Sequence, residues 1–315
     1  MQAETIKRRE DALIRALGPE LLKPLEDPAV IEILLNPDGK LWVERLGGHE
    51  LEHAANIDKV RAMSIIATVA GMLETTVTAE HPILECELPT DGSRFEALIP
   101  PVVSAPTFSI RKKASAVYTL DQYVASGIMT ERQREAILAA VSERKNILVA
   151  GGTGTGKTTL SNAILHALAE REPEHRVVII EDTRELQCQA PNTVYLRTSD
   201  TVDQTMLLRA TMRLRPDRIV VGEVRDKSAL ALLKAWNTGH PGGVGTVHAN
   251  DAAAALVRVG QLVQEAGVPP APDLIAEAVN VVVSIKRDRG ARRIEEVVAV
   301  SGYDAGTGFR IEKIA

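Results

Sequence analysis

The hydrophobic residues follow one pattern up to about residue 112 and another beyond it. In the first part, two stretches carry an apolar residue every three or four positions, which predicts helices over 4–17 and 56–73. Short apolar runs separated by Pro and Gly predict strands at 41–43, 83–88, 94–99 and 107–111. Residues 1–112 are therefore predicted to form a small α+β domain, and the basic and small residues of 113–120 a linker.

Beyond the linker, apolar strands alternate with amphipathic helices. The predicted strands are 146–150, 176–180, 218–221 and 244–247, followed by strand-like stretches at 281–285, 295–300 and 309–314. The predicted helices are 131–142, 157–170, 202–214, 227–237 and 251–265. Such alternation is typical of an α/β domain with a mostly parallel sheet. We therefore expect residues 121–315 to form a domain of this class.

One loop of the α/β part carries a phosphate-binding motif. The segment from Gly151 to Thr158 satisfies G-x-x-x-x-G-K-[ST], between a predicted strand and a predicted helix. Glycines let backbone N–H groups surround an anion, the helix N-terminus adds its dipole, and Lys157 adds a charge at the β- and γ-phosphates. The hydroxyl of Thr158 is a predicted ligand of Mg²⁺. The predicted nucleotide-binding residues are Gly151, Gly152, Thr153, Gly154, Thr155, Gly156, Lys157, Thr158 and Thr159.

Hydrolysis of a bound nucleotide also needs carboxylates near the metal ion and near the attacking water. Two predicted strands end in acids, one in Glu181 and Asp182 and the other, after Gly222, in Glu223. We predict that Glu223 acts on Mg²⁺, directly or through water, and that Glu181 polarises the attacking water. The alternative for each glutamate is that it is a solvated acid at a strand end. For Asp182, the alternative to a catalytic role is to cap the turn that follows the strand.

A histidine and several arginines complete the set of candidates. His248 ends a predicted strand, at the edge of a parallel sheet where ligands bind, so its imidazole is placed to donate to a γ-phosphate. A structural histidine is the alternative. An arginine on the γ-phosphate would accelerate hydrolysis, whereas a run of charges is more often a solvated face. The arginines of the α/β part gather at Arg209, Arg213, Arg215, Arg218 and Arg225, and a second basic cluster is Arg111, Lys112 and Lys113.

Composition argues against several other classes of protein. Lys and Arg total 37 and Asp and Glu 42, a net charge of −5, so no global charge attracts nucleic acid or anionic lipid. Cys86 and Cys188 are isolated and fit neither a disulfide framework nor a zinc site. The chain shows no apolar run of about 18 residues and no signal peptide, so we expect a cytoplasmic protein. The basic cluster 286–293 is predicted to be a turn, with a membrane or nucleic-acid contact as the alternative.

Four segments together resemble the secretion and traffic ATPases of type II secretion, type IV secretion and type IV pili. In order they read GGTGTGKTT, IIEDTREL, RLRPDRIVVGEVRD and TGHPGGVGTVHAN, which match that family's Walker A motif, Asp box, atypical Walker B motif and His box. With TFSIRKK before them, the resemblance covers nearly the whole chain. The short N-terminal part and the lack of a four-cysteine zinc module or a long C-terminal helical domain favour the conjugative type IV secretion branch.

The resemblance implies a RecA-like P-loop NTPase domain and a homohexameric ring, with nucleotide held between the two domains. By their positions in the motifs, Glu181 corresponds to the catalytic glutamate of the Asp box, Glu223 to the Walker B glutamate and His248 to the His-box residue. Arg111 and Arg94 match the N-terminal-domain arginines that reach the nucleotide in this family.

Together these observations predict a Mg²⁺-dependent ATPase motor of a conjugative type IV secretion system, which uses ATP to drive pilus assembly or substrate transfer. The resemblance implies partners among other secretion-system proteins and a cytoplasmic location with peripheral contact to the inner membrane. The acidic net charge argues against direct binding of nucleic acid. Two alternatives stay open: a pilus-type or DNA-translocating hexameric motor, and a nucleotide-dependent scaffold that does not hydrolyse. DNA-stimulated turnover would favour translocation, whereas the presence of both Glu181 and Glu223 argues against a scaffold.

Overall fold

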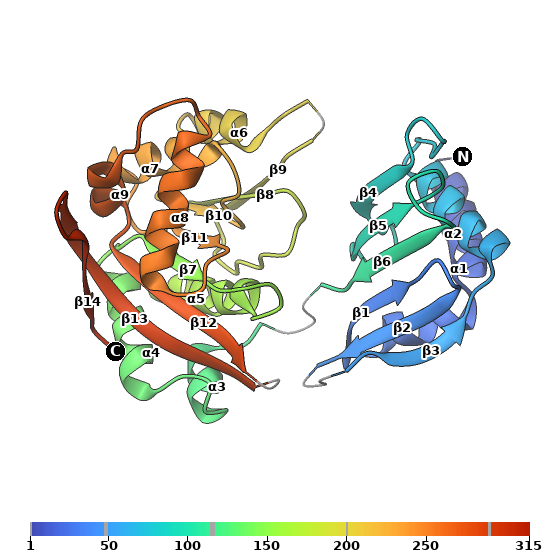
Figure 1. The fold of residues 1–315 in the computed structure, drawn as a ribbon, viewed down its shortest axis with the longest axis horizontal. Helices are drawn as coiled ribbons and strands as arrows, with labels where there is room; N and C mark the ends of the chain where they lie inside the picture. The colour runs from blue at the N-terminus through green and yellow to red at the C-terminus, as the bar shows by residue number, and fades with distance from the viewer. Residues whose placement is uncertain (1, 47–49, 114–116, 200, 289–290) are drawn as a thin grey trace. The chain divides into compact units, whose positions relative to one another are not determined.

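The computed structural model describes residues 2–46, 50–113, 117–199, 201–288 and 291–315, with the backbone alone for 2–7 and 9. The chain divides into two units, Met1–Ser115 and Ala116–Ala315 (Figure 1). The boundary falls within the predicted linker 113–120, of which residues 114–116 lie outside the described residues. Within the described ranges, none of the helices is both long and apolar enough to cross a membrane.

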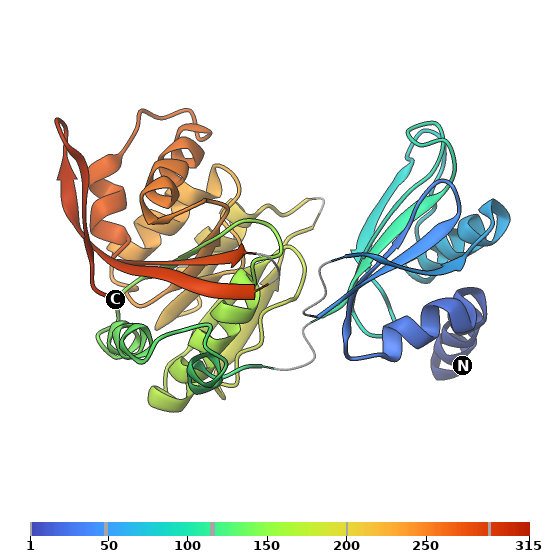
Figure 2. The same ribbon diagram turned by 60° about the horizontal axis from the view of Figure 1, so that its bottom comes forward.

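In the N-terminal unit, two helices cover one face of a six-stranded antiparallel sheet (Figure 2). The helices are α1 (Gln2–Glu26) and α2 (Lys59–Met72), and the sheet has the order β3-β2-β1-β6-β5-β4. Its strands are β1 (Val30–Leu35), β2 (Lys40–Arg45), β3 (Glu52–Asn56), β4 (Ile83–Glu87), β5 (Arg94–Leu98) and β6 (Thr107–Arg111). The core between helices and sheet is aliphatic, with Phe95 and Phe108 in contact at its centre. The predicted α+β class is confirmed.

Helix α1 continues beyond the helix predicted over 4–17. Its backbone leaves helical geometry at Gly18, where φ is 62°, and a second helical segment follows. Arg61 of α2 ties the two helices together at this kink, since its guanidinium donates to Leu17 O at 2.8 Å and to Glu20 Oε2 at 2.6 Å. Strand β3 was not predicted because its side chains are mostly exposed and give no apolar alternation.

The C-terminal unit is built on an eight-stranded sheet of order β14-β13-β12-β7-β11-β10-β8-β9. All neighbours from β12 to β9 run parallel, and β13 and β14 complete the sheet as antiparallel strands. The strands are β7 (Ile147–Ala150), β8 (Val177–Glu181), β9 (Thr193–Arg197), β10 (Arg218–Val221), β11 (Val244–Val247), β12 (Val281–Asp288), β13 (Ala291–Asp304) and β14 (Gly308–Lys313). The helices are α3 (Leu120–Ala125), α4 (Glu131–Ser142), α5 (Lys157–Arg171), α6 (Gln204–Thr211), α7 (Ser228–Asn237), α8 (Ala252–Gln264) and α9 (Pro272–Ala278).

Helices cover both faces of this sheet (Figure 1). Alternate residues of β7 face opposite layers: Ile147 and Val149 pack among α3, α4 and α5, whereas Leu148 packs among α7, α8 and α9. Because both faces are buried, the central strands are continuous apolar runs, as expected for a parallel sheet. The predicted α/β class with a mostly parallel sheet is confirmed. The short helices α3 and α9 and the half-buried strand β9 were not predicted, since none has a long apolar period.

Candidate active site

The phosphate-binding loop joins β7 to α5 at the carboxyl edge of the parallel sheet. Gly154 and Gly156 have φ values of 70° and 99°, a region that residues other than glycine rarely adopt. Gly151 has no room for a side chain, because a β-carbon there would lie 2.7 Å from Ile285 O. The loop is fixed internally by Thr155, whose hydroxyl donates to Gly152 O at 2.9 Å.

Lys157, His248 and Glu223 form a contiguous group at this edge. The Lys157 ammonium is buried and donates to the carbonyl oxygens of Gly151 and Gly152, each at 3.0 Å. It also lies 3.5 Å from Nδ1 and 3.3 Å from Nε2 of His248. His248 Nε2 is 2.7 Å from Glu223 Oε1, so this nitrogen carries a proton that it donates to the carboxylate. The structure thus brings together three residues that the sequence predicted from separate motifs.

Thr158 contacts Glu185, a residue that was not among the predicted site residues. Its hydroxyl donates to Glu185 Oε2 at 3.2 Å. Asn162, one turn along α5, holds the same segment, since it donates to Glu185 O at 3.4 Å and accepts from the Gln187 N–H at 2.8 Å. Glu185 follows the strand end by four residues in IIEDTREL, and no periodicity distinguishes it from Glu181, so only the path of the loop reveals it.

Glu181 has a different environment from Glu185. It is 5% exposed, and its Oε1 accepts the backbone N–H groups of Glu185 at 3.0 Å and Leu186 at 2.8 Å. Burial raises the pKa of its carboxyl to about 7, although the two backbone donors act in the opposite direction. A β-carbon on Gly222 would lie 2.9 Å from Glu181 Cγ, which explains why Gly precedes Glu223 at the end of β10. Glu181 therefore anchors the segment that carries Glu185.

Arg225 links the ends of β8 and β10. Its guanidinium is ion-paired with Asp182 and lies 3.9 Å from Glu223 Oε2. Asp182 also accepts from the Thr198 hydroxyl at 2.7 Å. Asp182 thus holds Arg225 and Thr198 rather than capping a turn. Asp182, Thr198 and Arg225 line a cavity of about 210 Å³ beside the site, together with Ser199, Asp203, Gln204 and Asp226.

Another arginine of the predicted cluster has a structural role. Arg218 is fully buried, and its guanidinium donates to Gly242 O at 3.2 Å, to Val141 O at 3.1 Å and to His175 Nδ1 at 3.2 Å. Burial lowers the pKa of Arg218 to about 10, and the nearby positive charge of Arg144 acts in the same direction. The bonds join β10 to the end of α4 and to the loop before β11.

The two predicted arginines of the N-terminal unit lie opposite each other. Arg94 begins β5 and Arg111 ends β6, and they are register partners in the antiparallel pair. Register partners project from the same face of a sheet, here the face opposite the one covered by α1 and α2, since Phe95 and Ile110 point toward the helices. Arg111 is exposed, and Arg94 lies 3.6 Å from Glu85 Oε1.

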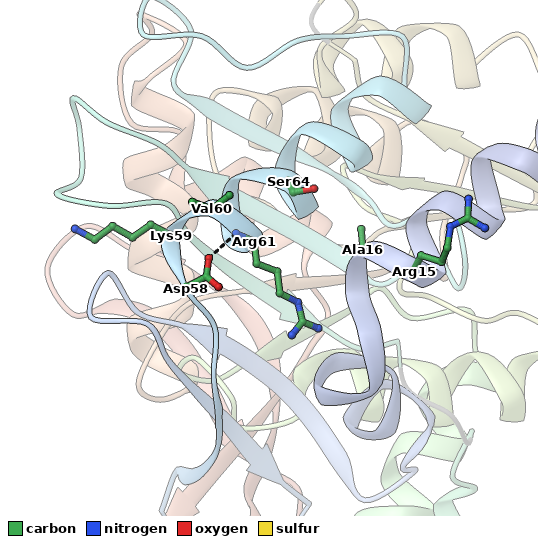
Figure 3. Close-up of a pocket in the computed structure, with 7 residues that line it drawn as sticks. All are labelled: Arg15, Ala16, Asp58, Lys59, Val60, Arg61 and Ser64. Atoms are coloured by element: carbon green, nitrogen blue, oxygen red, sulfur yellow. Dashed lines mark hydrogen bonds between the residues drawn. The ribbon is translucent and has the colours of Figure 1, made fainter.

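A hollow in the N-terminal unit contains none of the predicted site residues. It has a volume of about 840 Å³ and lies where α1 meets the start of α2 (Figure 3). Its lining residues are Arg15, Ala16, Asp58, Lys59, Val60, Arg61 and Ser64. Asp58 caps α2 by accepting the Arg61 N–H at 2.9 Å, as the dashed line in Figure 3 shows. Two of its charged residues thus have structural roles, Asp58 at the terminus of α2 and Arg61 at the kink of α1.

Comparison with known proteins assigns the family. The model of the type II/IV secretion system protein family matches residues 16–295. The chain belongs to this family. It is 53% identical over 294 residues to the probable conjugal transfer protein TrbB of Sinorhizobium fredii, covering 93% of this chain and 90% of that protein. It is 31% identical over 320 residues to the type IV secretion system protein VirB11 of Bartonella quintana, covering 87% of this chain and 89% of that protein.

A solved structure supports the fold. The Legionella pneumophila ATPase DotB matches with a TM-score of 0.63 at 18% identity, covering 88% of this chain and 79% of that chain. The resemblance drawn from the four motifs, including the type IV secretion branch, is therefore confirmed by the family match and by the similarity to TrbB and VirB11.

Proposed function

We propose that this chain is a Mg²⁺-dependent ATPase motor of a conjugative type IV secretion system. The observation that carries the proposal is the convergence of Lys157, His248 and Glu223 at one sheet edge, beside a glycine loop shaped for phosphate. The relatives support the process, since one is named as a probable conjugal transfer protein and another as a type IV secretion system protein. The DotB structure is that of an ATPase.

In this proposal each group has a task at the nucleotide, and Glu185 serves both the attacking water and the metal ion. The loop N–H groups and Lys157 bind the β- and γ-phosphates, and His248, held by Glu223 at 2.7 Å, donates to the γ-phosphate. Glu185 orients the attacking water, because its carboxylate lies beside Thr158 at the mouth of the loop. Glu181, the residue predicted for that task, supports it by fixing the backbone of Glu185.

The oxygen donors at Thr158 fit Mg²⁺. Thr158 Oγ1 and Glu185 Oε2 lie 3.2 Å apart, and hydroxyl and carboxylate oxygens are ligands that this ion prefers. When bound, Mg²⁺ would neutralise charge on the phosphate oxygens. Glu223, the second predicted ligand, is paired with His248 and would act on the ion through water.

The proposal extends to assembly and location. The chain works as a homohexamer with other secretion-system proteins, on the cytoplasmic side of the inner membrane and in peripheral contact with it. The net charge of −5 argues against direct binding of nucleic acid, which disfavours a DNA-translocating motor.

Steady-state phosphate release by the full chain tests the activity. We expect Mg²⁺-dependent turnover of ATP that Lys157→Ala abolishes and that Lys234→Ala, which removes an exposed lysine of α7, leaves unchanged. Glu223→Gln should bind ATP and lose turnover. No release by the wild-type chain, with or without lipid vesicles, would contradict a hydrolytic motor, and strong stimulation by DNA would favour translocation.

The same assay separates the two glutamates of the Asp box. Glu185→Gln should lower turnover by about 100-fold or more, as expected on removing a group that orients the nucleophile. Glu181→Gln should retain most activity, because an amide oxygen can still accept the N–H groups of Glu185 and Leu186. The opposite order would return the catalytic role to Glu181.

A further inference from the structure

The β12–β13 hairpin forms one wall of the phosphate-binding loop. Strand β12 pairs in parallel with β7, and Ser284 lies beside Ala150, the last residue of β7. The residues after Ser284 therefore continue past the end of β7, alongside the loop (Figure 1). Ile285 contacts the loop at Gly151. Its carbonyl oxygen lies so close that Gly151 has no room for a β-carbon. Of the basic cluster 286–293, residues 289 and 290 lie outside the described residues, and the others belong to this hairpin.

Two arginines of the hairpin lie against glycines of the loop. A β-carbon on Gly156 would lie 3.2 Å from both Cδ and Nε of Arg292, so the arginine stem packs directly on the loop backbone. A β-carbon on Gly154 would lie 3.8 Å from a terminal nitrogen of Arg287. Arg287 and Arg292 are register partners, which project from the same face of the hairpin. The glycines thus leave space for arginine side chains as well as for an anion.

The charges around Arg292 favour an anionic ligand. Its Nε is buried without a hydrogen-bond partner among the described residues, and a buried donor without an acceptor is unfavourable. Like charges directly opposite each other on two strands, as in the pair with Arg287, are also destabilising. The next residue, Arg293, behaves differently: it is exposed, and its guanidinium lies 2.6 Å from Glu295 Oε2.

We infer that Arg292, supported by Arg287, binds the α- and β-phosphates of the nucleotide within the same chain. This inference rests on the proposed nucleotide-binding function. In the sheet, β7 lies between β12 and β11, and His248 directly follows β11. Since Lys157, His248 and Glu223 gather on the β11 side, the γ-phosphate belongs there, and the opposite end of the triphosphate points toward β12 and its hairpin. Arg287 and Arg292 are then part of the nucleotide site.

Equilibrium titration of the full chain with ADP and with a non-hydrolysable ATP analogue tests this assignment. Both nucleotides carry the α- and β-phosphates, so Arg292→Ala should weaken both by a similar factor, about 10- to 100-fold for a charge-assisted contact. Arg292→Lys, which keeps the charge but loses the planar fork, should fall between wild type and Arg292→Ala. Arg293→Ala is the matched control and should change either affinity less than two-fold, because its partner is Glu295.

Several outcomes would overturn the inference. Unchanged affinities in Arg292→Ala would do so, and so would a loss confined to the ATP analogue, which would move Arg292 to the γ-phosphate. If Arg292→Ala does not fold, Arg292→Gln, which keeps the packing stem without the charge, decides between the same outcomes. Failure of the wild-type chain to bind either nucleotide would instead contradict the proposed function.

Discussion

At the scale of single residues, Glu181 connects the candidate site to the stability of the fold. Its carboxyl is buried at the end of β8 and accepts the backbone N–H groups of Glu185 and Leu186. Desolvation disfavours the ionised form, and this effect raises the pKa from 4.5 to about 7. The folded protein is therefore less stable with this acid ionised than with it protonated.

The raised pKa predicts a pH-dependent stability. The unfolded carboxyl ionises near pH 4.5 and the folded one near pH 7, so the unfolded state releases its proton first as the pH rises. The free energy of unfolding should therefore fall by about 3 kcal/mol between these pH values. Glu181→Gln should lose this component, which denaturant unfolding of both proteins at pH 5 and pH 8 would reveal. An equal difference between the two proteins at both pH values would contradict the burial argument.

At the scale of elements, one asparagine holds the bases of three elements together. Asn146 precedes β7 and is 2% exposed. Its Oδ1 accepts the N–H groups of Gly242 at 2.7 Å and Gly243 at 2.9 Å, and its Nδ2 donates to Ala278 O at 2.7 Å. The side chain thus fixes β7 to the start of β11 and to the end of α9, below the phosphate loop.

Replacing this asparagine should be costly. Asn146→Ala would leave three buried backbone groups without partners, which predicts a loss of about 3–5 kcal/mol in the free energy of unfolding. Urea denaturation followed by circular dichroism measures it. Asn237→Ala is the matched control, because Asn237 is exposed and donates to an exposed glutamate, and it should change stability by less than about 0.5 kcal/mol. A loss below about 1 kcal/mol for Asn146→Ala would mean that water replaces its bonds.

At the scale of the whole molecule, Arg111 and the phosphate loop belong to different units of the chain. Arg111 is an exposed residue at the end of β6 in the N-terminal unit, whereas the phosphate loop belongs to the C-terminal unit. If Arg111 reaches the γ-phosphate, bound ATP favours the state in which the two units approach each other. The shift of this equilibrium equals the difference in the affinity of ATP for the two states. Such a contact would make the nucleotide itself the signal for domain movement.

Nucleotide titration tests the role of Arg111. Arg111→Ala should leave the affinity for ADP nearly unchanged, weaken ATP binding by about 30- to 150-fold and lower turnover, since only ATP carries the γ-phosphate. Lys40→Ala, which removes an exposed positive charge from β2 of the same unit, should change neither affinity. Equal shifts for ATP and ADP would show that Arg111 does not sense the γ-phosphate. Arg292→Ala, by contrast, is expected to affect both nucleotides.

The sequence alone determined the features that depend on neighbouring residues. Three predicted elements agree with the structure in both ends: helix 131–142 is α4, strand 218–221 is β10 and strand 244–247 is β11. Apolar spacing and flanking residues set these ends. The glycine loop is a local feature as well: its positive φ angles and the adjoining helix follow from the residues between Gly151 and Thr159. Strand order brings His248 and Glu223 toward this loop, as expected for parallel strands whose carboxyl ends meet at one edge.

Only the tertiary structure decided which side chains of each motif meet the loop. Glu181 and Glu185 are four residues apart, yet one is buried as an anchor and the other contacts Thr158, because the chain bends sharply after β8. Arg218 and Arg225 share a motif, but Arg218 points into the core whereas Arg225 pairs with Asp182 beside the site. Arg292 packs on Gly156 through strand pairing far along the chain. Contacts of this kind depend on register and side-chain direction across the sheet, which no local pattern encodes.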